Sequence, residues 1–337
     1  MKIIIQLRTF VIVFIGLFLT VVAGLRGGND PDYASYYDIF LSSRYSEFSS
    51  IKIEPAYFYF NKLLSLAGVP FFFVMLLMAI PAVLLKMYVI YKHGHFYFFS
   101  ILIYVLTIYI SFDLIAVRQG VAIAFVMLAT SLWFYNRCLA ITMVLFGSLF
   151  HISSLIILPV FYCMSSKWHV RIINVSFLII LVVVVLGVNI NSFEIIKNIP
   201  FMPEFVIYKL EIYASYNQGG ANSVKQFLVC IVAFLISKLE LDNQFIKGVC
   251  FLYVIGFLFS LLLSSIGDIA FRIKWYFFWG EIFFIPYVLH LFVARSVNRN
   301  VIPFKVALFV ALIIIFYLYP AINFINDIST RGNSLIL

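Results

Sequence analysis

Two ionisable side chains lie five positions apart in an otherwise uncharged part of the sequence. From Phe96 to Tyr135, a stretch of forty residues, the only acidic and basic residues are Asp113 and Arg118. The segment "VRQG" places Arg118 and Gln119 at the start of a predicted helix, where free backbone N–H groups and the helix dipole favour an anion. The guanidinium adds a fork of donors that suits phosphate oxygens. The pattern therefore favours a bound diphosphate, with Asp113 orienting the guanidinium or remaining exposed. The alternative is that both side chains are boundary anchors that reach toward lipid headgroups.

A carboxylate and an imidazole stand at the ends of other predicted segments. Glu54 directly precedes Pro55, so we expect it just outside a helix that begins with proline. It is either a simple N-terminal acid or a carboxylate aimed at a substrate hydroxyl. His151 lies between two apolar runs and is followed by Ser153. It is either a packing residue or a base that accepts a proton from a hydroxyl nucleophile.

Two longer polar segments, 26–68 and 191–223, combine acidic groups with aromatic rings. Such a surface suits sugar hydroxyls and sugar faces, although the same residues also fit solvated turns and a plain surface helix. The sequence does not decide which of the two aspartates in the first segment is functional. The candidate substrate-binding residues in these segments are Arg26, Asp30, Asp32, Tyr33, Tyr57, Tyr213 and Tyr216.

A further ionisable group follows in "SSIGDIAFRIKWYFFWGEIFF". Asp268 and Arg272 are predicted just before a membrane span, with Glu281 about two turns inside it. A carboxylate within a span is a functional candidate, and its simpler explanation is a partner for an arginine. We expect Arg272 on the same membrane face as Arg118, so that two arginines hold one diphosphate.

Composition identifies the elements that must position these groups. Hydrophobic residues make up 64% of the 337 residues and charged residues 11%, and the mean hydropathy is +1.10. A soluble domain has about 25% charged residues, so the chain is predicted to be an all-α polytopic membrane protein. The net charge of +9 comes from scattered basic residues, which argues against a nucleic-acid partner. The four cysteines occur singly, which indicates neither a disulfide framework nor a metal site.

Apolar runs indicate about ten transmembrane helices in a single integral membrane domain, 1–337. The segment 138–165 either crosses once or forms a re-entrant pair of short helices that meet near "FHISS". With a cytoplasmic N-terminus, the re-entrant topology places more basic residues in short cytoplasmic connections, Lys86 and Lys92 among them. Segments 26–68 and 191–223 then become extracytoplasmic loops, too short for cores of their own and expected to pack on the bundle. The predicted spans are 9–25, 69–85, 96–112, 118–135, 172–190, 224–237, 247–265, 275–294 and 302–320, followed by a C-terminal tail.

No motif for nucleotide hydrolysis, serine-hydrolase chemistry or zinc binding occurs in the sequence. We therefore expect no cofactor and no metal. The substrate must then arrive already activated, which suits a lipid-linked diphosphate sugar.

Five motifs in this order resemble the EpsG-like family of Wzy-type polysaccharide polymerases: "LRGGNDPDY..Y", which ends at Tyr36, "EPAYFYFN", "VRQGVAIAF", "LFHISSLIILP" and "RIKWYF". The resemblance implies an enzyme of the bacterial cytoplasmic membrane that polymerises undecaprenyl-diphosphate-linked repeat units into O-antigen or exopolysaccharide. It implies roles for Arg26, Glu54, Arg118, His151 and the Asp30/Asp32 loop. The expected partners are the lipid-linked donor and acceptor glycans, the bilayer and a chain-length regulator protein. The alternatives are an O-antigen ligase and a polysaccharide flippase or transporter.

Overall fold

The structure is a computed structural model that describes residues 2–28, 30, 32–50, 53–187, 191–198, 211, 224–294, 296 and 301–334. Every regular element in these ranges is a helix, which confirms the predicted all-α class. Five of the described helices are long and apolar enough to cross a membrane, and a pair bent by 43° makes a sixth. Shorter apolar helices accompany them, so the chain is a multi-pass membrane protein, while the count of about ten crossings stays a prediction. The long helices are Leu7–Gly24, Phe71–His93, His169–Leu186, Gln244–Leu262 and Ile302–Ile328.

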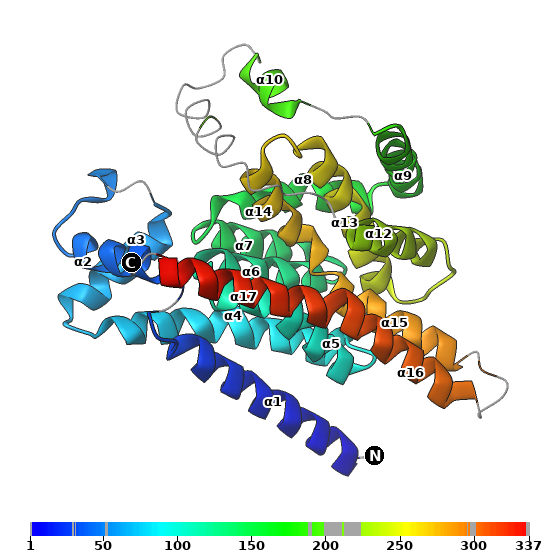
Figure 1. The fold of residues 1–337 in the computed structure, drawn as a ribbon, viewed down its shortest axis with the longest axis horizontal. Helices are drawn as coiled ribbons and strands as arrows, with labels where there is room; N and C mark the ends of the chain where they lie inside the picture. Colours follow the sequence, from blue (N-terminus) through cyan, green and yellow to red (C-terminus); the bar gives the residue numbers. More distant parts are fainter. Residues whose placement is uncertain are drawn as a thin grey trace. The chain divides into compact units, whose positions relative to one another are not determined.

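The chain divides into two compact units, Met1–Leu155 with Ile285–Leu337, and Ile156–Phe284. In the first unit, α1 (Lys2–Gly24) packs against α4 (Phe71–His93), and α4 packs against α6 (Val117–Trp133) (Figure 1). Between α4 and α6 the chain returns through α5 (Tyr97–Tyr104) and the π-helix η2 (Val105–Asp113). The arrangement brings the end of η2 next to the start of α6, and the two are in contact.

Three more segments complete this unit. Helix α7 (Arg137–Ser148) packs against α6. The C-terminal segment forms one continuous run of α16 (Ile302–Ile313), η5 (Ile314–Leu318) and α17 (Tyr319–Ser334), and its second half contacts η2. The predicted C-terminal tail after residue 320 is therefore helical as far as Ser334.

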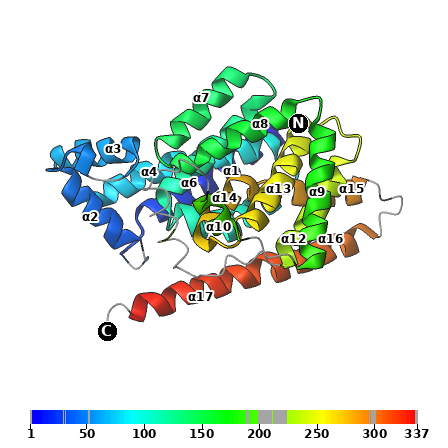
Figure 2. The same cartoon turned by 90° about the horizontal axis from the view of Figure 1, so that it is seen from above.

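The predicted loop 26–68 is folded onto the bundle. It contains α2 (Tyr33–Ser43), η1 (Phe48–Ser50) and α3 (Pro55–Leu66). Figure 2 shows α2 and α3 together beside the start of α4. Helix α3 contacts both α2 and α4. Tyr36 and Tyr57 from this loop share a buried apolar cluster with Phe71 of α4 and Val117 of α6. This cluster confirms that the loop packs on the bundle.

The second unit is organised around α13 (Gln244–Leu262). Helix α13 contacts α8 (Ile157–Ser165), α9 (His169–Leu186), α12 (Val224–Ser237) and α14 (Gly267–Phe278). Gly256 permits the closest of these approaches, since a Cβ there would lie 2.2 Å from Cβ of Phe277. The unit also includes α10 (Ser192–Lys197) and the start of α15 (Glu281–Ala294).

Two predicted segment boundaries differ from the structure, and one predicted break is present in it. The predicted span 69–85 continues to His93 as part of α4, so a lysine expected in a connection lies inside a helix. The predicted span 275–294 is broken between Phe278 and Glu281, and the break contains Gly280, where a Cβ would lie 3.0 Å from the Val249 carbonyl oxygen. Segment 138–165 is two helices, α7 and α8, separated by the 3-10 helix η3 (Ile152–Ile156). This confirms the break near "FHISS", and the re-entrant position in the membrane stays a prediction.

Candidate functional site

Arg26 is positioned by the close approach of α1 and α4. Helix α1 ends at Gly24, and a Cβ at that position would lie 2.6 Å from the Leu76 Cα atom. Only a glycine allows the two backbones to come so near each other. The contact fixes the end of α1, and Arg26 follows two residues later.

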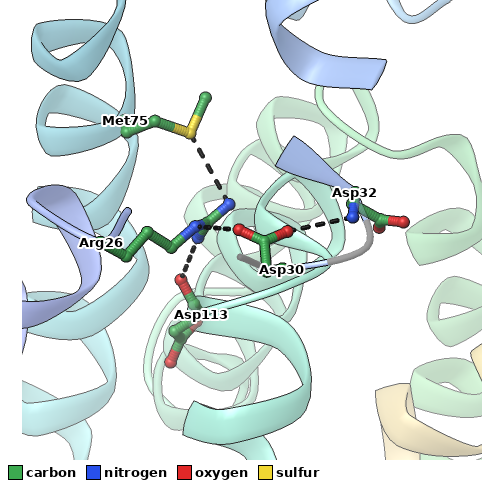
Figure 3. Close-up of polar contacts among 5 residues, drawn as sticks. All are labelled: Arg26, Asp30, Asp32, Met75 and Asp113. Carbon is green, nitrogen blue, oxygen red and sulfur yellow. Dashed lines mark hydrogen bonds and ion pairs between the residues drawn. The ribbon is translucent and has the colours of Figure 1, made fainter. Parts of the chain in front are cut away.

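The Arg26 guanidinium is held by three groups, which Figure 3 shows around it. Its Nε lies 2.8 Å from Oδ2 of Asp30, its Nη1 donates to the backbone carbonyl of Asp113 at 3.2 Å, and its Nη2 lies 3.7 Å from the Met75 sulfur. The side chain is only 8% exposed. Arg26 therefore links the first loop, α4 and the end of η2.

Asp30 and Asp32 have different roles in this loop. Asp30 pairs with Arg26, and its second oxygen accepts the backbone N–H of Asp32 at 3.0 Å. Asp32 occupies the N-cap position of α2. Burial raises the pKa of the Asp30 carboxyl above its ordinary value, and the Arg26 charge and the Asp32 N–H act in the opposite direction. Of the two aspartates left open by the sequence, Asp30 is the one that binds the arginine.

Arg118 is the second residue of α6, so it lies at the start of a helix as predicted, and it forms an ion pair with Glu54. The distance from Arg118 Nη1 to Glu54 Oε2 is 2.6 Å, and the two side chains are 23% and 17% exposed. Glu54 is the extended N-cap residue of α3, with Pro55 following it, which confirms the predicted local structure. The Glu54 side chain makes no capping hydrogen bond to its own helix. Its carboxylate is directed to the guanidinium instead.

Two buried tyrosines flank the Arg118 guanidinium. Its Cζ lies 5.8 Å from the ring centre of Tyr36 and 5.5 Å from that of Tyr57, and the two rings meet edge to face. Burial raises the pKa of both phenols, and the positive charges of Arg118 and Arg26 act against it. Among the described residues, the buried Tyr57 hydroxyl and Arg118 Nε have no hydrogen-bond partner.

Asp113 is paired with Lys86, which corrects two predictions. It neither orients Arg118 nor stays exposed, because its carboxylate is fully buried in an ion pair with the Lys86 ammonium. Its second oxygen accepts the Tyr104 hydroxyl at 2.6 Å. The prediction that Lys86 lies in a short cytoplasmic connection is wrong, since it is a fully buried residue of α4.

The end of α7 is tied to the start of α3. The Ala56 N–H donates to the Leu149 carbonyl at 3.0 Å, so His151 lies two residues beyond a direct contact with the helix that Glu54 precedes. His151 and Ser153 are both half-buried. The predicted base is therefore carried by a segment that contacts the α3 start, and its role in catalysis stays a prediction.

Comparison with known protein families assigns this arrangement to one of them. The model of the EpsG family matches residues 9–332, nearly the whole chain. The chain belongs to the EpsG family. EpsG proteins are Wzy-like polymerases, which confirms the resemblance inferred from the five motifs. None of the curated proteins and none of the solved structures compared with the chain matches it.

The remaining predicted residues of this EpsG-family protein have different settings. Tyr33 packs edge to face on Phe71 at 5.2 Å, and Gln119 is buried at the start of α6. Arg272 lies within helix α14 of the second unit, not in a connection, so its cooperation with Arg118 stays a prediction. Tyr213 and Tyr216 lie outside the described residues.

Glu281 also differs from its predicted setting. It is the first residue of α15, beside the break, and it forms an ion pair with Lys225 at 3.7 Å; an arginine partner stays a prediction. Within the described ranges, no three His, Cys, Asp or Glu side chains come together in a way that could hold a metal ion.

Four residues of this EpsG-family site were not among the predicted site residues: Tyr36, Asn61, Lys86 and Tyr104. A lysine inside a membrane span is a functional candidate, and a predicted span extended beyond residue 85 would have found Lys86. Asn61 lies one helical turn after Tyr57 and donates to its carbonyl at 2.7 Å. That spacing was a usable signal. Tyr36 ends the first of the five motifs, whereas nothing local distinguished Tyr104 from other tyrosines.

Proposed function

We propose that this protein polymerises undecaprenyl-diphosphate-linked oligosaccharide repeat units into O-antigen or exopolysaccharide by glycosyl transfer. We place the reaction at the outer face of the bacterial cytoplasmic membrane. The family supports the polymerase class. A chain-length regulator protein remains an expected partner.

One observation carries the site assignment. Arg26 and Arg118 each pair with a carboxylate of segment 26–68, and Arg26 also donates to the backbone carbonyl of Asp113, five residues before Arg118. A diphosphate has the charge and the acceptor oxygens to replace a carboxylate on a guanidinium. We infer that the donor diphosphate takes the place of Glu54 on Arg118, with Arg26 as the second cation.

In the proposed transfer, the bond between the anomeric carbon of the growing chain and its diphosphate oxygen breaks. A new bond forms to a hydroxyl oxygen of the acceptor repeat unit, and undecaprenyl diphosphate leaves with the electron pair. The arginines stabilise the charge that develops on the leaving group. His151, or Glu54 once it is released from Arg118, accepts the hydroxyl proton. Arg272 remains a predicted contributor to diphosphate binding.

The test is genetic deletion followed by electrophoresis of the surface glycan. We expect a ladder of chain lengths to collapse to a single repeat unit, and the wild-type gene to restore it. An Arg118→Ala variant should be present in the membrane and fail to restore the ladder. Arg137→Ala removes the same charge from an exposed position at the start of α7 and should restore it. A full ladder with Arg118→Ala would exclude the proposed role of Arg118.

The same experiment separates the alternative functions. Loss of a ligase would leave long polymer that is not attached to its acceptor. Loss of a flippase would leave single lipid-linked units on the cytoplasmic side of the membrane. Either pattern would overturn the proposed polymerisation.

A further inference from the structure

A fully buried ion pair joins α4 to the turn that precedes Arg118. The Lys86 ammonium contacts Oδ1 of Asp113, and both side chains are 0% exposed. The ammonium also donates to the Gly120 carbonyl at 2.9 Å, and Tyr104 donates to the second Asp113 oxygen at 2.6 Å. Both ions are thus satisfied by groups from α4, α5, η2 and α6.

A buried ion pair of this kind contributes little to the free energy of folding. Removing two charges from water costs about as much as their attraction returns, and apolar replacements of buried pairs are often neutral or stabilising. Within an apolar helix bundle the cost is higher still, because no water compensates for an imperfect contact. A pair in this position is therefore better explained by what it orients.

The pair fixes residues 113–120, the segment on which both arginines depend. Arg118 projects from this segment, and Arg26 donates to the backbone carbonyl of Asp113. Gly120 brings the first turn of α6 against the carboxylate, since a Cβ there would lie 2.6 Å from Asp113 Oδ1. The Asp113 side chain is therefore held from one side by Lys86, while its backbone holds Arg26 from the other.

We propose that Lys86 and Asp113 are positioning residues that set the geometry of the turn 113–120 and, through it, the placement of Arg118 and Arg26. The structural part of the inference stands on the contacts alone. Its consequence for turnover rests on the proposed function. The pair does not touch the substrate.

The first test measures hydrogen exchange of the protein in nanodiscs. In the paired variant Lys86→Met/Asp113→Asn, the amides of residues 114–120 should exchange at least about tenfold faster, while the rest of α4 and α6 stays unchanged. Unchanged exchange in 114–120 would overturn the proposal. A uniform increase throughout both helices would also overturn it, because the pair would then act only on general stability.

Two further variants keep this test decisive. Ser131→Ala removes another side-chain contact between the same two helices, the partly buried 2.7 Å contact from Ser131 to His93, and should leave 114–120 protected. Tyr104→Phe removes one hydrogen bond to Asp113 and keeps the ion pair. If the paired variant fails to fold, Tyr104→Phe should still raise exchange in 114–120, and no increase there would overturn the proposal.

The second test measures polymerisation rate per folded molecule in a mutant cycle with Arg118→Lys. The paired variant should lose about tenfold to a hundredfold, as expected for a displaced catalytic group. Added to Arg118→Lys, it should cause little further loss, because both changes act on the same guanidinium. If the rate losses of the paired variant and of Arg118→Lys multiply in the combined variant, the positioning role is overturned. A wild-type rate for Arg118→Lys alone would instead refute the proposed role of Arg118 in diphosphate binding and leave the exchange result intact.

Discussion

Replacing Glu54 with glutamine should strengthen diphosphate binding. Glu54 is the counter-ion of Arg118 at 2.6 Å, and the proposed donor must displace it. The Glu54→Gln variant keeps the shape of the side chain and a neutral hydrogen bond, but it removes the competing charge. The guanidinium is then more available to an incoming phosphate.

The magnitude follows from the burial of the pair. With side chains 23% and 17% exposed, solvent screens the interaction only in part. A hydrogen bond between charged groups contributes about 1.5–3 kcal/mol and a neutral one about 1 kcal/mol. The ligand thus has about 1–2 kcal/mol less to overcome. Because about 1.4 kcal/mol corresponds to a tenfold change in affinity, undecaprenyl diphosphate should bind about 5- to 30-fold more tightly.

The assay is titration of undecaprenyl diphosphate into purified protein in nanodiscs, with Asp38→Asn as the matched control. Asp38 is an exposed carboxylate on α2, and an exposed charge contributes at most about 1 kcal/mol, so its replacement should change affinity only slightly. Weaker or unchanged binding by Glu54→Gln would refute the displacement of Glu54 by phosphate. If Glu54 is also the base, the tighter-binding variant should turn over about a hundredfold more slowly.

Three other predictions concern the surrounding contacts. Gly120→Ala places a Cβ 2.6 Å from Asp113 Oδ1 and should destabilise the protein by about 1–3 kcal/mol. Gly27→Ala is the control, because a Cβ there meets no heavy atom within 4 Å. Equal melting temperatures for the two variants would contradict the close packing at Gly120. Because burial raises the pKa of Asp30, the folded state binds that proton more tightly than the unfolded state. The free energy of unfolding of the wild type relative to Asp30→Asn should therefore decrease as the pH rises from about 4 through the raised pKa, and thermal unfolding with the opposite trend would refute this. Arg26→Lys keeps the charge but not the three contacts of the guanidinium, so the polymerisation rate per folded molecule should fall about tenfold. An unchanged rate would show that the hydrogen-bonding geometry of the Arg26 guanidinium is not needed.

Local signals in the sequence predicted the starts of the helices that carry the site. Pro55 marked the beginning of α3 and left Glu54 as its N-cap, and "VRQG" marked the beginning of α6. These features depend on backbone conformation within a few residues, which sequence patterns record well. The break at "FHISS" was predictable for the same reason.

The partners of the ionisable groups were not predictable in this way. Glu54 and Arg118 are 64 positions apart, and Lys86 and Asp113 are 27 positions apart. Which carboxylate meets which cation depends on how helices pack, and a single sequence holds no record of that. The proximity of Asp113 and Arg118 along the chain suggested a pair, yet the π-helical end of η2 turns Asp113 toward α4.

Hydropathy also misplaced Lys86 for a physical reason. A lysine normally marks the end of a span because an isolated ammonium in hydrocarbon is costly. That rule fails where a carboxylate and a carbonyl satisfy the ammonium inside the bundle, as Asp113 and Gly120 do here. A buried partner thus converts an apparent boundary residue into an interior one.

The most direct measurement of the central claim is a cryo-electron microscopy structure of the protein in nanodiscs with undecaprenyl diphosphate bound. The account predicts phosphate oxygens within hydrogen-bonding distance of both Arg26 and Arg118, on the extracytoplasmic side, with the Glu54 carboxylate moved away from Arg118. A diphosphate bound elsewhere, with the Arg118–Glu54 ion pair intact, would contradict it.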